Sequence, residues 1–503
     1  MRYNNAHMNL YELKSGTDIR GTAIEADGEK VNLSVEEIRR IGGAFTDWLA
    51  RKTGKKQLSV AVGHDSRLTS AFFSDTLVET FRKCGVSVYN CGLASTPSMF
   101  AMTKHKETNC DGAVMITASH HPYHKNGLKF FTTTGGLSAL EIDDILELAA
   151  LGAHFVGDRA EIYQEDYLRI YADNLVAFVR NRTGVLHPLS GLKIVLDAGN
   201  GVGGFYASRV LVPLGADTSG SQFLDPDGRF PNHIPNPEDE EAMQSISACV
   251  LRNKADLGII FDTDVDRAAI VDKSGMEINR NRLIALISAI LLEENPGAYI
   301  VTDSVTSDGL KKFIQNHGGL HLRYKRGYNN VISQAKKLIA EGKNAVIAIE
   351  TSGHAAFREN DFLDDGAYLV TRILIKMAEL KKQKKELSDL ISDLERAASK
   401  YETRILFKDI KDYKVYGDFI ISDLTEFSKR TFALEPSTYE GVRVNIDYAQ
   451  GWFMLRQSVH DKNMALNIES RLPDGARTIA KILYKYLSAF RGLNCPGLKD
   501  FIQ

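Results

Sequence analysis

The sequence is poor in cysteine and carries almost no net charge. Its five cysteines form no CxxC pair and are odd in number, so we expect no disulfide framework and a reducing compartment, the cytoplasm. A net charge of −2 provides no excess of basic residues for binding a polyanion. Nucleic acid is therefore not an expected partner.

Long hydrophobic segments are missing as well. The longest apolar run, Leu283 to Leu292, is interrupted by Ser288 and is too short to span a bilayer, so it predicts a buried helix. The amino-terminal segment MRYNNAHMNLYELKSG has no basic region followed by an apolar stretch, so we expect no secretory signal. These features predict a water-soluble protein that does not associate with a membrane.

Strand and helix patterns, by contrast, alternate along most of the chain. Ser34 and Glu37 form a capping-box pattern, which predicts that a helix begins there. Apolar runs of strand length recur, and each ends in a small or polar loop. They lie at 58–67, 112–121, 192–201, 256–267 and 344–354. Continuous apolar strands are typical of sheets that are buried on both faces, and such sheets bind ligands at the carboxyl ends of their strands.

The chain is long enough for several domains, since 503 residues exceed the usual size of one hydrophobic core. The strand-and-loop unit recurs near residues 62, 195 and 347, which predicts three related α/β domains. Residues 442–446 and 452–455 alternate like antiparallel strands, and 478–487 has the pattern of an amphipathic helix. We therefore predict an α/β fold with three related mixed α/β domains and a smaller C-terminal α+β domain.

One acidic segment, DTDVDR at 262–267, has the composition of a metal-binding loop. Asp262, Asp264 and Asp266 alternate after an apolar strand, so their carboxylates can face one cation, and they repel one another without it. Arg267 stands where an EF-hand needs glycine, so we favour Mg²⁺ with phosphate oxygens over Ca²⁺. Two alternatives stay open. One is a solvated acidic turn, and the other is a haloacid-dehalogenase-type phosphatase with Asp262 as its nucleophile.

A second polar segment, MITASHHPYHKNGLKFF at 115–131, brings a hydroxyl, histidines and lysines into one loop. Ser119 could be a nucleophile, a helix cap or a carrier of phosphate. A serine hydrolase of the Gly-x-Ser-x-Gly type is disfavoured because no glycine flanks Ser119 in that pattern. A phosphate on Ser119 would need cationic donors and a metal nearby.

Four segments together resemble the α-D-phosphohexomutase family of phosphoglucomutases and phosphomannomutases. TASHHPYHKNGLK (117–129) is similar to its phosphoserine loop, DTDVDR to its magnesium loop, ETSGH (350–354) to its sugar-binding loop, and RQS (456–458) to the start of its phosphate-binding loop. Further matches are GTDIRG (16–21), VGHDSR (62–67), FPNHIPNPE (230–238) and DDG (364–366). The motifs occur in family order and cover nearly the whole chain.

The resemblance implies four domains around a central cleft. We place a phosphoserine domain at 1–183, a metal-binding domain at 184–295, a sugar-binding domain at 296–400 and a phosphate-binding domain at 401–503. It also implies that Ser119 is phosphorylated and that one of its phosphate oxygens joins the three aspartates in holding Mg²⁺. The implied acid/base and charge-stabilising residues are Lys129, His120, Arg20 and Arg267.

For substrate binding, the resemblance assigns the sugar hydroxyls to Glu350, Ser352 and His354. The implied residues for the non-reacting phosphate are Arg456, Ser458, His460 and Lys325. The sequence also departs from the family pattern. His121 and Lys125 replace the usual asparagine and tyrosine, and the phosphate loop continues RQSVHDKN, so that Val459 offers no side-chain donor.

The predicted function is a Mg²⁺-dependent phosphohexomutase. It would interconvert the 1-phosphate and the 6-phosphate of glucose, mannose or both, with a hexose 1,6-bisphosphate as intermediate and activator. Hexose phosphates are the expected partners, and we expect a monomer or a homodimer. The alternatives are a phosphoglucosamine mutase, a hexose-bisphosphate synthase and a non-catalytic sugar-phosphate-binding protein.

Overall fold

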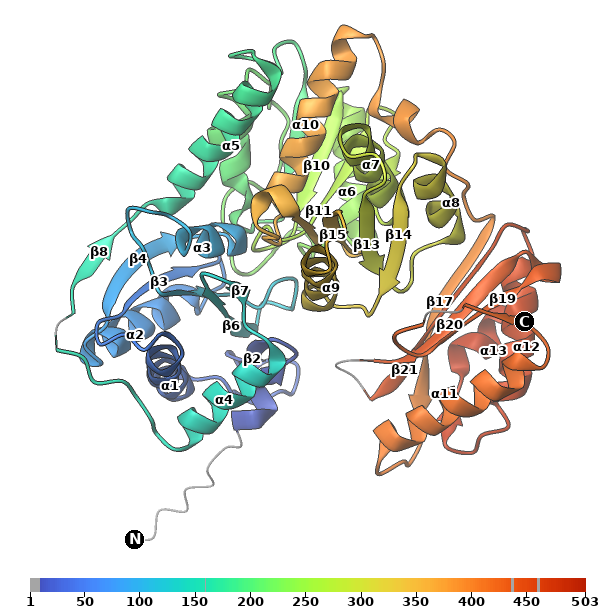
Figure 1. The fold of residues 1–503 in the computed structure, drawn as a ribbon, viewed down its shortest axis with the longest axis horizontal. Helices are drawn as coiled ribbons and strands as arrows, with labels where there is room; N and C mark the ends of the chain where they lie inside the picture. Colours follow the sequence, from blue (N-terminus) through green and yellow to red (C-terminus); the bar gives the residue numbers. More distant parts are fainter. Residues whose placement is uncertain (1–9, 159, 436–437, 459–461) are drawn as a thin grey trace. The chain divides into compact units, whose positions relative to one another are not determined.

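The computed structural model describes residues 10–158, 160–435, 438–458 and 462–503 (Figure 1). The chain divides into two compact units. The first comprises Met1–Ile290 and Ser352–Leu390, and the second comprises Leu291–Thr351 and Ile391–Gln503. Each unit is described separately below.

The first unit begins with an eight-stranded mixed sheet. Its strand order is β1-β2-β6-β5-β3-β4-β8, and β7 pairs with β6. The central strands β5, β3 and β4 are parallel, β6 runs antiparallel to β5, and β2 runs antiparallel to β6. The strands are β1 (Lys14–Ser15), β2 (Asp18–Thr22), β3 (Ser59–His64), β4 (Ser87–Leu93), β5 (Gly112–Ile116), β6 (Lys125–Thr132), β7 (Gly135–Gly136) and β8 (Ile162–Gln164).

Helices cover this sheet and bury its apolar strands. Ser34 and Glu37 form the predicted capping box at the start of α1, and α1 packs against α2 and α4 (Figure 1). Every residue of β5 is buried, as expected for a strand covered on both faces. The helices are α1 (Val35–Thr53), α2 (Ser70–Lys83), α3 (Thr96–Met102) and α4 (Ala139–Ala150), and the following helix α5 (Tyr167–Thr183) packs mainly against α10 (Gly366–Lys382).

A second sheet in the first unit has the order β12-β11-β10-β9. Strands β9 and β10 are parallel, and β10 returns as the antiparallel strand β11 through residues 262–267. The strands are β9 (Ile194–Asp197), β10 (Leu257–Phe261), β11 (Ala268–Asp272) and β12 (Glu277–Ile278), and β16 (Ala355–Phe357) also lies in this unit. The helices are α6 (Glu240–Asn253) and α10 (Gly366–Lys382). Helix α7 (Asn281–Glu294) contains the predicted buried helix, since residues 283–292 are all buried.

The second unit contains a parallel sheet and an antiparallel sheet. In the first of these, β13 pairs in parallel with β14 and β15. The second has the order β18-β19-β20-β21-β17-β22. The elements are β13 (Tyr299–Asp303), α8 (Asp308–Asn316), β14 (Leu320–Tyr324), α9 (Tyr328–Ala340), β15 (Ala345–Ile349), β17 (Ser399–Phe407), α11 (Tyr413–Lys429), β18 (Ala433–Leu434), β19 (Val442–Ile446), β20 (Gly451–Gln457), β21 (Asn463–Ser470), α12 (Gly475–Leu487), β22 (Leu493–Asn494) and α13 (Pro496–Ile502).

The predicted fold class is confirmed. Three sheets with their helices precede a sheet-rich C-terminal part in the sequence. In that part, α11, α12 and α13 pack on the antiparallel sheet around one hydrophobic core (Figure 1). The predicted strands at 442–446 and 452–455 are β19 and part of β20, and the predicted closing helix lies in α12. The four domain boundaries and the central cleft stay predictions.

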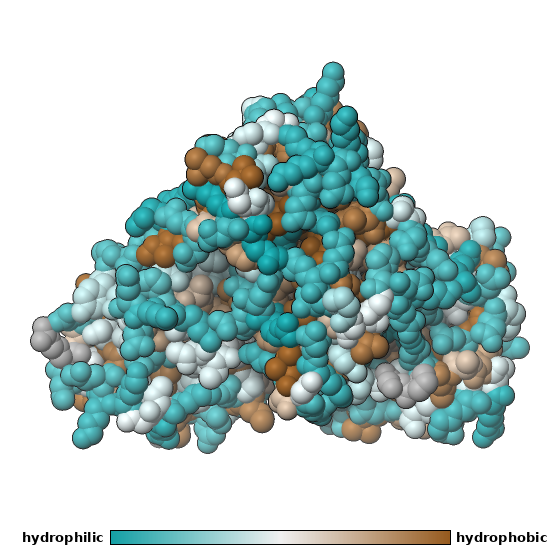
Figure 2. Space-filling view, turned by 45° about the horizontal axis from the view of Figure 1, so that its top comes forward, coloured by the Kyte–Doolittle hydropathy of each residue, from teal (hydrophilic) through white to brown (hydrophobic). Residues whose placement is uncertain are grey.

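The surface and the thiols agree with the composition. Hydrophilic residues dominate the face drawn in Figure 2, where hydrophobic residues form separate patches. Among the residues that the structure describes, no helix has the length and the hydrophobicity that crossing a bilayer requires. All five cysteines lie within the described ranges, and each is a buried free thiol.

Candidate active site

Ser119 lies in the loop between β5 and β6 and is almost fully buried. Its φ of 52° falls in the left-handed region, which residues other than glycine rarely adopt. The backbone amide of Ser119 donates to Thr117 Oγ1 at 2.9 Å, and its hydroxyl donates to Asp262 Oδ2 at 3.0 Å. Strained backbone of this kind concentrates at functional sites. Here it directs the serine hydroxyl toward the aspartate loop.

The three predicted metal ligands form one buried cluster. Asp262, Asp264 and Asp266 occupy the turn between β10 and β11, and each offers an oxygen within 4.8 Å of the oxygens of the other two. In the described part of the chain, Oδ1 of Asp264 and Oδ1 of Asp266 are buried without a hydrogen-bond partner. Buried acceptors without donors are costly, so this cluster fits a hard divalent cation.

Lys129 on β6 partly neutralises the cluster. Its ammonium lies 2.9 Å from Asp264 Oδ2 and 2.5 Å from Asp266 Oδ2. Burial disfavours ionised Asp266, but the charges of Lys129, His354 and Arg267 outweigh it and lower the pKa of Asp266. Burial raises the pKa of Asp262 well above its usual value, and the neighbouring carboxylates raise it further. The two carboxylates therefore differ in proton affinity although they share one loop.

His120 also approaches the serine hydroxyl, and its Nδ1 is 3.3 Å from Ser119 Oγ. Burial lowers the pKa of His120 well below 6.5, and nearby cations including Arg267 and Arg20 lower it further. The imidazole is therefore neutral at physiological pH. A neutral imidazole at this distance can accept a proton from the hydroxyl.

Arg267 and His354 form a second set of contacts beside the aspartates. The Arg267 Nε donates to His354 Nε2 at 2.9 Å, and His354 Nδ1 lies 2.5 Å from Asp364 Oδ2. The main-chain amide of Arg267 donates to Asp262 Oδ1 at 3.2 Å. Burial disfavours the charged form of His354, but Asp364 and Asp266 outweigh it and raise its pKa. The predicted sugar-binding residue His354 thus also belongs to the aspartate cluster.

Arg20 lies on β2 and forms an ion pair with Asp18 at 2.8 Å. Its charge acts on His120 and on Arg67, so it contributes to the positive potential around Ser119. The structure thus brings together in the first unit all the predicted catalytic and metal-binding residues. These residues are Ser119, His120, Lys129, Arg20, Asp262, Asp264, Asp266 and Arg267.

Two further residues contact this cluster although neither was predicted as a site residue. Asp364, which was quoted only as part of a supporting motif, fixes the ring of His354. Thr96, at the start of α3, donates from Oγ1 to Asp264 Oδ2 at 2.5 Å and from its amide to Asp264 O at 2.9 Å. A threonine 168 residues from its partner leaves no local sequence signal.

The predicted substrate-binding residues are divided between the units. Ser352 belongs to the first unit, and its Oγ is buried without a hydrogen-bond partner among the described residues. In the second unit, Gly327 at the start of α9 donates its amide to Glu350 Oε1 at 2.6 Å. Lys325 is exposed two residues earlier.

Of the predicted phosphate-binding residues, Arg456 lies near the end of β20 and Ser458 directly follows this strand. Arg456 is 6% exposed, and burial lowers its pKa, with Glu440 acting in the opposite direction. The amide of Ser458 donates to Asn463 O at 2.9 Å. His460 lies outside the described residues.

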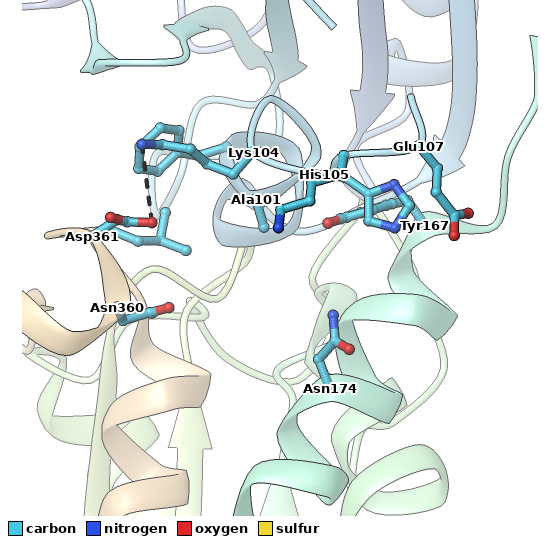
Figure 3. A pocket seen from close by; sticks show the side chains of 11 residues that line it. Ala101, Lys104, His105, Glu107, Tyr167, Asn174, Asn360 and Asp361 are labelled. Carbon is cyan, nitrogen blue, oxygen red and sulfur yellow. Dashed lines mark ion pairs between the residues drawn. The ribbon is translucent and has the colours of Figure 1, made fainter. Parts of the chain in front are cut away.

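A cavity of about 430 Å³ lies elsewhere in the first unit (Figure 3). Residues of α3, of the loop after it, of α5 and of the segment 360–363 line it, and Lys104 and Asp361 pair at its edge at 4.0 Å (Figure 3). None of the predicted site residues that the structure describes lines this cavity. The Ser119 cluster is therefore a separate feature.

Three family models match successive parts of this chain. They describe the alpha/beta/alpha domains I, II and III of phosphoglucomutase/phosphomannomutase and match residues 13–151, 169–275 and 279–397. Together they cover more than half of the sequence.

Individual relatives agree with these matches. A phosphoglucomutase of Neisseria gonorrhoeae is 29% identical over 84% of this chain and 87% of its own length. A phosphomannomutase/phosphoglucomutase of Pseudomonas syringae pv. tomato is 30% identical over 84% of this chain and 86% of its own. A crystal structure of a phosphoglucomutase/phosphomannomutase family protein from Burkholderia thailandensis superposes with a TM-score of 0.78 at 28% identity, covering 94% of this chain and 96% of the other.

Proposed function

Because this chain belongs to the phosphoglucomutase/phosphomannomutase family and is an enzyme of the mutase class, we propose that it interconverts hexose 1-phosphates and hexose 6-phosphates. The substrates would be glucose phosphates, mannose phosphates or both. Ser119 would carry the phosphoryl group, and a hexose 1,6-bisphosphate would be the intermediate. In line with the composition, we also propose that the enzyme is cytoplasmic and acts as a monomer or homodimer without nucleic acid or membrane partners.

One observation carries this proposal. The hydroxyl of Ser119 lies 3.0 Å from Asp262 Oδ2, at the edge of a cluster of three buried carboxylates that fits a cation. Mg²⁺ held by Asp262, Asp264 and Asp266 together with a phosphoserine oxygen would neutralise the charge that spreads over the phosphoryl oxygens during transfer. A serine that only capped a turn would need neither the cluster nor the strained backbone.

The protein's own groups then perform the steps around the phosphoryl group. When the Ser119 hydroxyl attacks a phosphate of the bisphosphate, its proton has to leave, and neutral His120 lies 3.3 Å away to accept it. Lys129 contacts two carboxylates, and this position suits a role in stabilising charge during transfer. His354, oriented by Asp364, holds the guanidinium of Arg267 beside Asp262.

Substrate binding is proposed for the residues that the sequence assigned to it. Glu350 and Ser352 would bind sugar hydroxyls, and Gly327 already fixes one oxygen of Glu350. Arg456, with Ser458, Lys325 and His460, would bind the phosphate that does not react, as arginine side chains commonly do. The bisphosphate would turn around between the two transfers, so that each end of the sugar meets Ser119 once.

The phosphoenzyme step can be tested directly by mass spectrometry. We expect the purified enzyme to carry one phosphoryl group in its intact mass after exposure to glucose 1,6-bisphosphate, whereas Ser119→Ala carries none and turns over no sugar phosphate. Rates on the 1-phosphates of glucose, mannose and glucosamine then identify the substrate. Undiminished turnover by Ser119→Ala would exclude the phosphoserine mechanism, and turnover that depended on Asp262 alone would indicate an aspartate nucleophile.

A further inference from the structure

The side chain of Arg67 binds the main chain of the segment 119–125, called the Ser119 loop below. Arg67 follows β3 and is only 2% exposed. Its Nη2 donates to the carbonyl oxygens of Ser119 and of His121, the latter at 2.6 Å. Its Nη1 donates to the carbonyl oxygens of Pro122 at 2.7 Å and Lys125 at 3.0 Å. One guanidinium thus holds four carbonyls between the end of β5 and the start of β6.

Arg67 is itself held rigidly. Asp65 Oδ2 lies 3.2 Å from its Nε, and the main-chain amide of Arg67 donates to Asp65 Oδ1 at 2.9 Å. The hydroxyl of Ser70 also donates to Asp65 Oδ1, at 2.6 Å. The ring of Phe230 lies 5.2 Å from the guanidinium carbon. A planar guanidinium fixed in this way can donate to several acceptors at once, whereas a lysine ammonium on its flexible side chain cannot reach all of them.

The contacts of Arg67 bear on the unusual backbone of Ser119. The left-handed conformation of Ser119 costs free energy, and a conformation of this kind persists only where its surroundings enforce it. Arg67 binds the carbonyl of Ser119, while the hydroxyl on the same residue points at Asp262. Without Arg67, several buried carbonyls would lose their donor. The loop would then relax, and the hydroxyl would turn away from the aspartates.

We propose that Arg67 is a positioning residue for phosphoryl transfer, because it locks the Ser119 loop in the conformation that aims the hydroxyl at the aspartate cluster. This role rests on the proposed function of Ser119. Arg67 acts through the main chain of the loop, so its loss should slow transfer to and from Ser119 and leave the affinity for the sugar phosphate nearly unchanged. Loss of a residue that only stabilised the fold would not slow the transfer step while leaving the affinity for the sugar phosphate unchanged.

The test compares Arg67→Lys with Arg372→Lys. Arg372 on α10 is equally buried and pairs with Glu359 at 3.1 Å, so it controls for the loss of a buried guanidinium. Phosphorylation of Ser119 by glucose 1,6-bisphosphate is followed by intact mass, together with kcat, KM and the melting temperature. We expect phosphorylation and kcat to fall about a hundredfold in Arg67→Lys, as for a reacting group displaced by roughly 1 Å, with KM changed less than about threefold. Arg372→Lys should change only the melting temperature.

Two results would overturn this role. Phosphorylation of Arg67→Lys at the wild-type rate would show that the loop holds its conformation without the guanidinium. A wild-type enzyme that carried no phosphoryl group on Ser119 before or after exposure to glucose 1,6-bisphosphate would instead overturn the proposed function, and the role of Arg67 with it. Where Arg67→Lys does not fold, Phe230→Leu removes the ring from the guanidinium and should slow the same step several-fold. An unchanged rate in that variant would also count against the proposal.

Discussion

His354 and Asp364 form a buried pair in which Nδ1 lies 2.5 Å from a carboxylate oxygen. The opposite ring nitrogen, Nε2, accepts from Arg267 Nε at 2.9 Å, and the carboxylate beside Nδ1 favours the tautomer that carries its proton on Nδ1. The orientation of the guanidinium beside Asp262 therefore depends on Asp364, which lies outside the 262–267 loop and has an oxygen within 4.8 Å of one of Asp266. Carboxylates that orient an imidazole in this way usually have measurable effects on activity.

The first prediction concerns this pair. Asp364→Asn keeps the size of the side chain but removes the charge that fixes the histidine tautomer, so we expect kcat to fall by about tenfold to a hundredfold. Asp361→Asn is the matched control, because Asp361 is exposed and its φ of 55° suits asparagine. Steady-state kinetics on both variants make the comparison. Equal activities of the two variants would argue that Asp364 has no such role.

The second prediction concerns Lys129, which we expect to be essential to the charge balance of the site. Lys129→Met leaves Asp264 and Asp266 buried without their ammonium, a change that typically costs about 3–5 kcal/mol of unfolding free energy, and kcat should drop by at least about a hundredfold. Lys125→Met, on the same strand, removes a more exposed pair with Glu29 and a hydrogen bond to Thr22 Oγ1 and should change either quantity little. Denaturant unfolding and kinetics measure both effects. A stable and active Lys129→Met variant would contradict the assignment.

The third prediction is that Mg²⁺ stabilises the folded protein. A cation bound by three buried carboxylates should raise the free energy of unfolding by about 2.7 kcal/mol when its concentration is a hundred times its dissociation constant. The melting temperature should therefore rise with Mg²⁺ and fall again with a chelator, and activity should disappear with the metal. Asp264→Asn should abolish the Mg²⁺-dependent shift. A melting temperature independent of Mg²⁺ would exclude a cation at this cluster.

The fourth prediction concerns pH and a histidine of the second unit. His321 on β14 pairs through Nε2 with Thr302 Oγ1 at 2.8 Å, and its Nδ1 is buried. Burial, reinforced by Arg323, Arg443 and Lys311, lowers the pKa of His321 well below 6.5. Below about pH 6.5 the unfolded chain binds a proton that the folded chain does not. This one group should therefore lower the unfolding free energy by about 1.4 kcal/mol per pH unit as the pH falls.

Denaturant titrations between pH 7.5 and 5.5 test this contribution. We expect His321→Asn to remove part of the slope, because asparagine cannot be protonated in this range. His154→Asn, at an exposed position, serves as the control and should leave the slope close to that of the wild type. Identical slopes for all three proteins would show that His321 ionises equally well in both states.

Local patterns predicted much of the fold. The capping box of Ser34 and Glu37 identified the start of α1, and the run from Leu283 to Leu292 identified a buried helix. Each of these two signals is formed by residues that are close together in the sequence. The apolar strands were recognisable for the same reason, and the rule that polar residues at their carboxyl ends carry function identified the loops of Ser119 and Asp262.

Contacts between distant residues could not be predicted from such patterns. The hydrogen bond from Thr96 to Asp264 spans 168 residues. The guanidinium of Arg67 donates to main-chain carbonyls more than fifty residues away. Every residue has such a carbonyl, so the sequence does not reveal which ones Arg67 binds. The left-handed backbone of Ser119 also gave no signal, because serine is not a residue that usually adopts it. These features result from tertiary packing, which composition and periodicity do not encode.

The burial of every cysteine has a practical consequence for measuring motion in this enzyme. Burial raises the pKa of all five thiols, to about 12 for Cys110 and to about 11 for Cys495. Thiolates react with maleimides and thiols do not, so the native chain should label slowly. A single cysteine introduced on an exposed helix could therefore carry a fluorophore without prior removal of the others, and the enzyme could be followed by fluorescence during turnover.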